Sequence, residues 1–485
     1  MNDDSGSNTM RIGLNVPLFI SSLCAILIGA PLLGLIGVWG FLMQGKAVPS
    51  FLKVLHAHIC WWSLIIVIAS LVVPHLSLKP LVKRLITWGS FLLIPVYVIL
   101  MTMHYTMAHP YVLSLGALGS FYVSFPGVGI FVCESGFFAV MIALGLLAAG
   151  VKIPFLTDEK GELSRYEISS PVEVPRRAFL GYSIFLTIAV ITGFLILFLF
   201  TLQHKAISPA ALVQMHTHLG IFALGLVMVP LAMSAVGAKK EKIYLVSTLG
   251  NVVVFLTFLG LLAFILLKTH SIVWIAPGLL YVYLLFFGWH SLWGGLGLRE
   301  GINHFTRIAL IFIWGAMLFY ALVGPLLGLL YDTHPNVTVT YKQGSAKPSG
   351  IYPASGSDTS LHVGAYPDPE HYPGTAPVKN TPRGLENLHL SPTSWSHVAI
   401  FWLIILLIFG EGILKAIGRP TLIFFLAVTI AQAPFFNSIG RIGAWLDIKG
   451  GPGPLYLVGH PLKTLNIIIL IVVMLAWMKK VKERA

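Results

Sequence analysis

Three short histidine motifs contain the residues whose types and spacing suit metal or cofactor chemistry. The chain reads His-Ala-His at 56–58, His-Thr-His at 216–218 and Trp-Ser-His at 395–397. Each motif begins a long apolar run, and in the third motif tryptophan stands at the first histidine position. Histidine inside a membrane segment is costly and usually functional, because it lines a water path, holds a metal or relays protons.

The spacing within each motif limits what its histidines can do together. Helical residues at i and i+2 point about 200° apart, so His56 and His58, like His216 and His218, face opposite sides of their helix. They therefore do not chelate one ion as a pair. One imidazole directed to each side suits a helix placed between two cofactors, since neutral imidazole ligates haem iron and copper.

The composition places these motifs in a membrane protein. The 485 residues are 56% hydrophobic and only 10% charged, which is too little charge for a soluble globule of this size. The formal net charge of +13 could point to nucleic acid in a soluble protein. Here we interpret it through the positive-inside rule, with the lipid bilayer and not nucleic acid as the partner.

The apolar runs predict an all-α polytopic membrane protein with twelve transmembrane helices. Runs long enough to cross a bilayer of roughly 30 Å lie near 14–42, 52–73, 84–106, 126–149, 177–203, 208–236, 243–268, 271–297, 306–330, 395–417, 420–440 and 456–478. Most of the 31 Lys and Arg residues fall inside when both termini are cytoplasmic. The motifs then lie at the outer ends of helices two, six and ten, which predicts three consecutive four-helix units.

These runs also divide the chain. We expect a membrane domain at 1–330 with helices one to nine, and a second membrane part at 395–485 with helices ten to twelve. Between them, 331–394 is rich in Pro, Gly and Ser and is predicted to be extracytoplasmic, where it either caps the outer face or receives a partner, or else forms a disordered insertion. The segment 152–177 is expected to be a solvated cytoplasmic linker.

Further polar residues in or near the apolar runs are secondary candidates. Glu134 is predicted to be a proton-path or redox-site carboxyl, or else an acid hydrogen-bonded to a neighbouring helix. His104, His109 and His460 are expected at the depth of the motifs, as metal ligands, proton relays or structural residues. Glu411 and His290 are weaker candidates for a functional site. The same holds for the histidines of the long loop, which are His334, His362, His371 and His389.

The arrangement resembles subunit I of the haem-copper oxidase superfamily, including its nitric-oxide-reductase branch and the NnrS-type membrane proteins. The resemblance rests on three four-helix arcs about a pseudo-threefold axis and on histidines of helices two, six and ten. It implies that His56 or His58 is an axial ligand of a low-spin haem and that His216 or His218 binds copper or non-haem iron. Helix ten of that family carries a His-x-His pair that serves both haems. In this chain only His397 corresponds to that pair, because Trp395 stands at the other position.

This chain also departs from the family pattern. The run at 241–268 lacks the adjacent histidines that bind the second metal, and helix six lacks the His-Pro-Glu-Val-Tyr sequence. We therefore expect one or two b-type haems, held by pairs drawn from His56, His58, His216, His218 and His397. Copper or non-haem iron is a further possibility.

The resemblance implies a prokaryotic membrane oxidoreductase that reduces oxygen or nitric oxide, or that transfers electrons in a respiratory chain. Its electron donor would be a quinol, a cytochrome or a cupredoxin, and further membrane subunits could complete it. Two alternatives remain at this point. One is a transporter for transition metals or protons, and the other is a regulatory or assembly subunit that has lost turnover.

Overall fold

The computed structural model describes eleven stretches of the chain. They are 8–38, 50–123, 125–158, 162–197, 210–267, 271–294, 301–333, 336–340, 375–379, 383–445 and 453–484. Within them the side chains of some segments, 104–123 and 383–392 among them, are not described.

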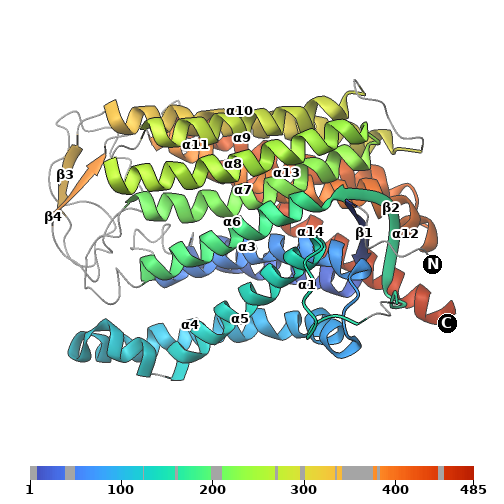
Figure 1. Ribbon diagram of the computed structural model, residues 1–485. Helices are drawn as coiled ribbons and strands as arrows, with labels where there is room; N and C mark the ends of the chain where they lie inside the picture. The colour runs from blue at the N-terminus through green and yellow to red at the C-terminus, as the bar shows by residue number, and fades with distance from the viewer. Residues whose placement is uncertain are drawn as a thin grey trace.

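Long apolar helices make up the body of the protein and run side by side (Figure 1). The helices are α1 Val16–Leu27, the π-helix η2 Ile28–Val38, α3 Ser50–Val72, η3 Val73–His75, α4 Pro80–Val123, α5 Phe125–Ala148, α6 Arg176–Leu197, α7 Ala210–Ala235, α8 Lys240–Leu267, α9 Ser271–Leu292, α10 His304–Thr333, α11 Arg383–Ile405, η5 Leu406–Gly410, α12 Glu411–Ala416, α13 Leu422–Trp445 and α14 Gly453–Arg484. Ten spans in the described residues are long and apolar enough to cross a membrane, and Ala276–Leu292 and Leu422–Phe436 are shorter apolar helices. The expected all-α membrane fold is confirmed at this level.

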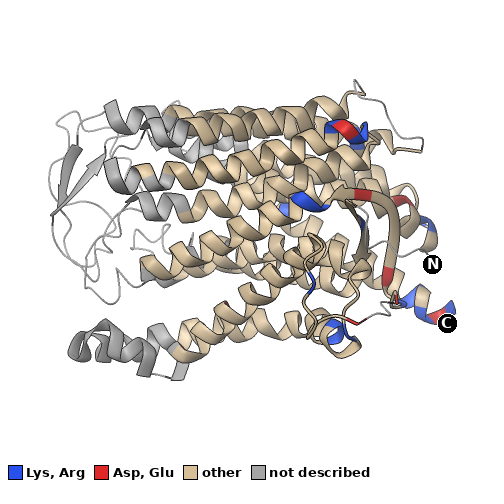
Figure 2. Ribbon diagram, in the orientation of Figure 1, with Lys and Arg blue, Asp and Glu red and all other residues tan. Residues whose placement is uncertain are grey.

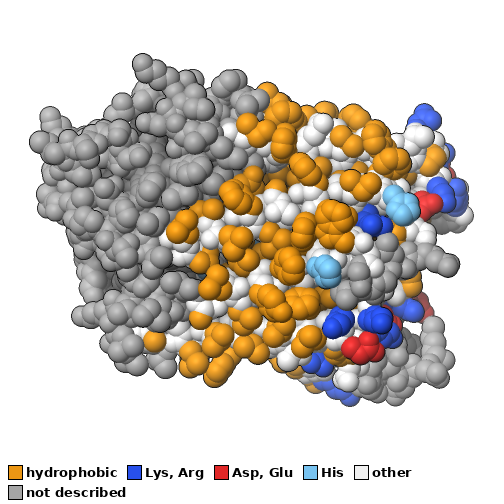
Figure 3. Space-filling model, turned by 90° about the horizontal axis from the view of Figure 1, so that it is seen from above, with side chains coloured by type: hydrophobic (Ala, Val, Ile, Leu, Met, Phe, Trp, Pro, Cys, Tyr) orange, Lys and Arg blue, Asp and Glu red, His pale blue; other side chains and the backbone are white. Residues whose placement is uncertain are grey.

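The surface has the distribution expected of a protein in lipid. Hydrophobic side chains spread over the described part of the bundle in Figure 3, and charged side chains gather at one end. Figure 2 shows that both termini and the strands β1 Thr9–Asn15 and β2 Glu167–Pro175 lie at this same end, which we call the charged end. Large exposed side chains such as Leu92 and Phe255, 71% and 59% exposed, fit contact with acyl chains rather than water.

Several sequence-based boundaries differ from the structure. The segment 152–177 is not only a linker, because β2 pairs antiparallel with β1. The expected loop at 331–394 is shorter, since α10 continues to Thr333 and α11 begins at Arg383, and it contains the antiparallel strands β3 Asn336–Thr340 and β4 Thr375–Lys379. Helix α4 runs well past the predicted 106. Strands paired over such long sequence separations leave no local signal, and polar residues can continue a helix beyond its apolar run.

The three motif helices form the centre of the bundle. Their membrane windows, in α3, α7 and α11, are 78%, 83% and 78% buried, whereas those of α4 and α5 are 28% and 33% buried. Each motif helix packs against the helix before it in the chain, and α7 contacts both α3 and α11. The histidine motifs are therefore carried by the helices that are most enclosed by protein.

A buried acid joins the sheet to the helices at the charged end. Glu167 of β2 has a fully buried side chain and forms an ion pair with Lys83, with Nζ 2.7 Å from Oε2. It also accepts hydrogen bonds from Asn15 Nδ2 at 2.9 Å and from the Ser164 amide at 2.7 Å. Asn15 in turn caps α1 by accepting a hydrogen bond from the Leu18 amide at 3.0 Å. One carboxylate thus connects β1, β2, α1 and α4.

Replacing this acid should destabilise the protein measurably. We expect Glu167→Ala to lower the free energy of unfolding by about 3 kcal/mol, because it leaves a largely buried lysine without its counter-charge. The matched control is Glu411→Ala, since Glu411 pairs with Lys415 at 2.6 Å but is 53% exposed, and an exposed pair contributes less than about 1 kcal/mol. Thermal unfolding in detergent micelles measures both, and equal unfolding temperatures for the two variants would contradict the assignment.

Candidate functional site

Two of the motif histidines make the same bond to the preceding helix. His56 Nδ1 lies 2.7 Å from the carbonyl oxygen of Gly29, and His216 Nδ1 lies 2.7 Å from that of Ala189. The sequence separation is 27 residues in both cases. A carbonyl oxygen can only accept, so Nδ1 carries the proton and the Nε2 lone pair of each neutral imidazole stays available. Metal-ligating histidines usually have their other ring nitrogen held in this way.

A glycine one turn further along makes room for each ring. A Cβ atom on Gly34 would lie 2.6 Å from His56 Cε1, and one on Gly193 would lie 3.0 Å from His216 Cε1. Gly34 follows Gly29, whose carbonyl accepts the bond from His56, by five residues within the π-helix η2, and Gly193 follows Ala189 by four residues within α6. One turn of a π-helix spans about one residue more than one turn of an α-helix, so the two glycines are equivalent. Neither glycine was among the residues predicted from the sequence.

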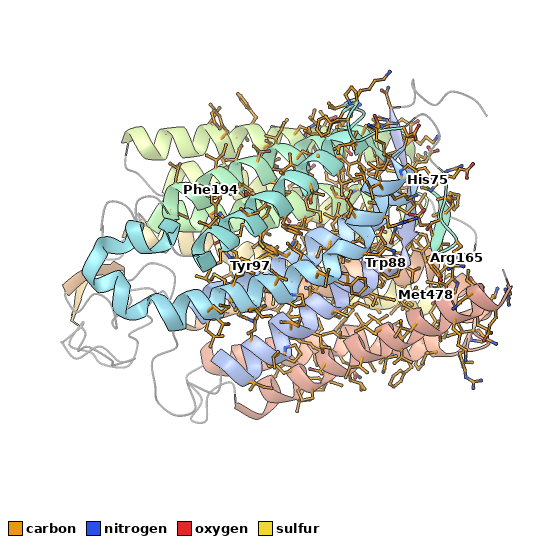
Figure 4. The ribbon with its side chains drawn as sticks, turned by 90° about the horizontal axis from the view of Figure 1, so that it is seen from below. His75, Trp88, Tyr97, Arg165, Phe194 and Met478 are labelled. Atoms are coloured by element: carbon orange, nitrogen blue, oxygen red, sulfur yellow. The ribbon has the colours of Figure 1, made fainter. Side chains whose placement is uncertain are left out.

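His58 faces away from His56, toward a cluster built from four helices. Glu134 of α5 lies with Oε1 3.7 Å from His58 Nδ1. Tyr97 of α4 donates a short hydrogen bond to Glu134, and its hydroxyl lies 3.4 Å from His58 Nδ1. The rings of His58 and His216 meet edge to face, with centroids 6.2 Å apart. We call Tyr97, Glu134, His58 and His216 the acid cluster; Figure 4 shows Tyr97 among the helices, away from the charged end.

His397 lies outside the acid cluster and has its own hydrogen-bond partners. Its Nδ1 donates to the carbonyl oxygen of Thr393, one turn back on α11, at 2.7 Å. Its Nε2 accepts a hydrogen bond from the hydroxyl of Tyr281 on α9 at 3.1 Å. Tyr281 also packs on Phe222, with ring centroids 4.3 Å apart, and the His218 ring lies edge-on to Phe222 at 5.9 Å. His218 and His397 therefore lie on the side of α7 that faces α9 and α11.

A buried lysine from another helix contacts the first residue of the third motif. Lys463 of α14 is 2% exposed, and its Nζ lies 3.7 Å from the ring centroid of Trp395. Lys463 was not among the residues predicted from the sequence, and a lysine inside the apolar run 456–478 was the signal that could have identified it.

Polar side chains from three further helices contact the motif helices. Glu134 of α5 lies 3.7 Å from His58 of α3, whose ring meets the His216 ring of α7. Tyr281 of α9 contacts α7 at the Ile221 carbonyl and α11 at His397. The ammonium of Lys463 on α14 lies over the Trp395 ring of α11. An acid, a phenol and an ammonium thus each lie beside a motif helix. The three places differ in charge and therefore in the groups that they would favour.

The remaining candidates are less central. His460 is buried on α14, 9% exposed, one turn before Lys463. His290 is exposed and stacks on Phe286, and Glu411 forms the exposed ion pair with Lys415. The side chains of His104, His109, His334, His362, His371 and His389 lie outside the described residues. In the part of the chain that the structure describes, no three His, Cys, Asp or Glu side chains group closely enough to hold a metal ion.

The glycine contacts make the ring positions testable. We expect Gly34→Ala and Gly193→Ala to displace the rings of His56 and His216 and to cost about 1–3 kcal/mol, as overpacking does. Gly220→Ala is the control, because a Cβ there would meet no described atom within 4 Å, and alanine is favoured over glycine in a helix by about 1 kcal/mol. Thermal unfolding compares the three variants; an effect of Gly220→Ala as large as the other two would refute the close contacts.

Comparison with known proteins gives no relative for this chain. No protein-family model, no curated protein and no solved structure matches it. The resemblance to the haem-copper oxidase superfamily therefore stays a prediction from the sequence, and the arguments about function rest on the geometry described above.

Proposed function

We propose that this chain is an integral membrane redox protein in which His56 and His216 are axial ligands of b-type haem. The observation that carries the proposal is the matched pair of Nδ1–carbonyl bonds, 27 residues apart in both cases, which leaves both Nε2 lone pairs available. Its helices are twelve, in three units of four with both termini in the cytoplasm. Its reaction is the reduction of oxygen or nitric oxide, or electron transfer within a respiratory chain.

The contacts of the motif helices support the three-unit arrangement. Each motif helix is the second long helix of its proposed unit and packs against the first, which is α1 with η2, α6 or α10. The polar side chains that contact the motif helices, Glu134, Tyr281 and Lys463, come from α5, α9 and α14, the fourth long helix of each proposed unit. Such a recurrence is expected when one supersecondary unit is used three times.

The donor set fits haem better than a metal ion bound only by side chains. A porphyrin supplies four nitrogen ligands, so the protein needs to provide only one or two. Copper or non-haem iron would need a cluster of three or more side chains, and the described residues contain none. His56 and His216 fit an axial role as they stand, whereas His397 would have to exchange its hydrogen bond from Tyr281.

A bound haem would supply a one-electron iron couple and a place for a small gas to bind. The chain's own residues would orient the imidazoles through the Gly29 and Ala189 carbonyls and enclose them in apolar helices. Electrons would come from a quinol, a cytochrome or a cupredoxin, directly or through further membrane subunits.

A reduced-minus-oxidised optical spectrum of the purified protein, with haem quantified per chain, tests this proposal. We expect Soret and α bands of haem b in the wild type. His56→Ala and His216→Ala should each lose most of the absorbance of the haem that they ligate, because each removes an iron–nitrogen bond. His290→Ala is the control, since His290 is exposed on α9. A wild-type protein without haem would overturn the proposal.

A second candidate function is favoured by the acid cluster. An acid, a phenol and two imidazoles held together within membrane helices are also the groups that proton- or metal-ion-coupled transporters use. Glu134 and His58 keep 21% and 30% of their side-chain surfaces exposed. If the protein contains no haem, uptake of protons or Zn²⁺ into proteoliposomes by the wild type, and its loss in Glu134→Gln, would identify this function.

A further inference from the structure

The segment between α5 and β2 exposes apolar side chains outside the helices. Residues 151–156 read Val-Lys-Ile-Pro-Phe-Leu and follow the end of α5, and β2 lies at the charged end (Figure 2). Phe155 is 72% exposed and Val151 is 43% exposed, and Lys152 is exposed as well. Exposed apolar side chains grouped with cations are typical of segments that enter the boundary between lipid headgroups and acyl chains.

Backbone hydrogen bonds hold this segment against the start of α4. The amide of Lys79 donates to the carbonyl oxygen of Leu156 at 2.9 Å, and the amide of Leu156 donates to that of Ile153 at 3.0 Å. The segment is therefore a turn that is bonded to the residue preceding α4. Lys152 and Phe155 flank the two bonded residues of this turn, so both lie close to Lys79.

Helix α4 presents an apolar stripe to the lipid, and the stripe begins at the same place. The exposed large apolar side chains of α4 recur every three or four residues, so they lie on one face of the helix. They are Leu81, Leu85, Trp88, Leu92, Val96 and Ile99, between 43% and 71% exposed. In Figure 4, Trp88 lies between Tyr97 and the charged end, as expected for an indole at the membrane–water interface. The first turns of α4 are therefore at the level of the lipid headgroups.

Exposed cations outnumber acids where the segment meets α4. The exposed charged side chains of 77–86 and 151–158 are Lys79, Arg84 and Lys152 against Asp158. Within the described part of the chain, none of the three cations takes part in an ion pair. Arg84 follows Lys79 by five residues, which is roughly 7.5 Å along a helix axis. This spacing suits a single phosphate group contacted by more than one cation.

We propose that this surface binds the phosphate group of an anionic phospholipid in the leaflet at the charged end. We call it the interfacial patch, and it consists of Lys79, Arg84, Trp88, Lys152 and Phe155. The cations contact the phosphate, Phe155 inserts beside the upper acyl carbons, and the acyl chains continue along the stripe of α4. A zwitterionic lipid fits less well, because its own ammonium group meets the same cations. The inference goes beyond the proposed function and does not depend on haem, so either can fail alone.

Native mass spectrometry of the purified full-length protein in detergent, titrated with phosphatidylglycerol, tests this inference. We expect a saturable site for phosphatidylglycerol that binds phosphatidylcholine more weakly. The triple variant Lys79→Gln, Arg84→Gln, Lys152→Gln should weaken this site by about fivefold for each charge removed, because each Lys or Arg near an anionic lipid surface contributes a factor of that order. Phe155→Ser should weaken it while leaving the charge of the protein unchanged.

A matched control separates the interfacial patch from the net charge of the protein. Lys239→Gln with Lys240→Gln removes two exposed lysines at the start of α8, beside the exposed acid Glu241. This pair should leave the phosphatidylglycerol site unchanged. An equal loss in the pair and in the triple variant, or equal binding of phosphatidylcholine and phosphatidylglycerol, overturns the inference.

Two further measurements complete the test. Inorganic phosphate is titrated in parallel, and binding as tight as that of the lipid would mean a site for a free anion and would refute the lipid assignment. Thermal unfolding without added lipid shows whether each variant folds. If the triple variant does not fold, Arg84→Gln alone decides, with a fivefold loss expected and unchanged binding contradicting the inference. A protein without haem would bear on the proposed function only.

Discussion

The structure depends on how the imidazole nitrogens buried between apolar helices find partners. An imidazole inside a membrane bundle has two nitrogens, and each needs a partner or a ligand. His56 and His216 satisfy Nδ1 with a carbonyl of the preceding helix, which requires the two helices to approach closely. Glycine at the contact allows that approach. The same bond that stabilises the helix pair also determines which nitrogen remains free for chemistry.

The sequence allowed prediction of the features that depend on local pattern. Hydrophobic length identified the membrane helices, and the i, i+2 spacing predicted that His56 and His58 turn to opposite sides, as their contacts with Gly29 and Glu134 show. Features that depend on distant residues were missed. Tyr97 and Tyr281 resemble any other aromatic residue in an apolar run, and only tertiary packing brings their hydroxyls to Glu134 and His397. The pairing of β1 with β2 likewise joins segments more than 150 residues apart.

The three motifs look equivalent in the sequence, but the charged or polar group beside each of them differs. The first residue of each motif is His56, His216 or Trp395, and the sequence indicates only that the third differs. The structure adds that the fourth long helix of each proposed unit brings a different group, which is Glu134, Tyr281 or Lys463. A carboxyl favours a nearby cation or proton, a phenol can only share a hydrogen bond, and an ammonium disfavours a second cation. Divergence after repetition would give one scaffold three environments.

The tryptophan at 395 is best understood together with the lysine that it contacts. A histidine there would present an imidazole to Lys463, and two cationic or cation-binding groups would compete within a buried space. An indole instead offers an electron-rich face that attracts the ammonium without carrying a charge. Tryptophan at 395 therefore provides no imidazole and stabilises a nearby cation. This place in the bundle is consequently suited to hold a fixed positive charge rather than a metal, and the ligation that we propose involves only the first two motifs.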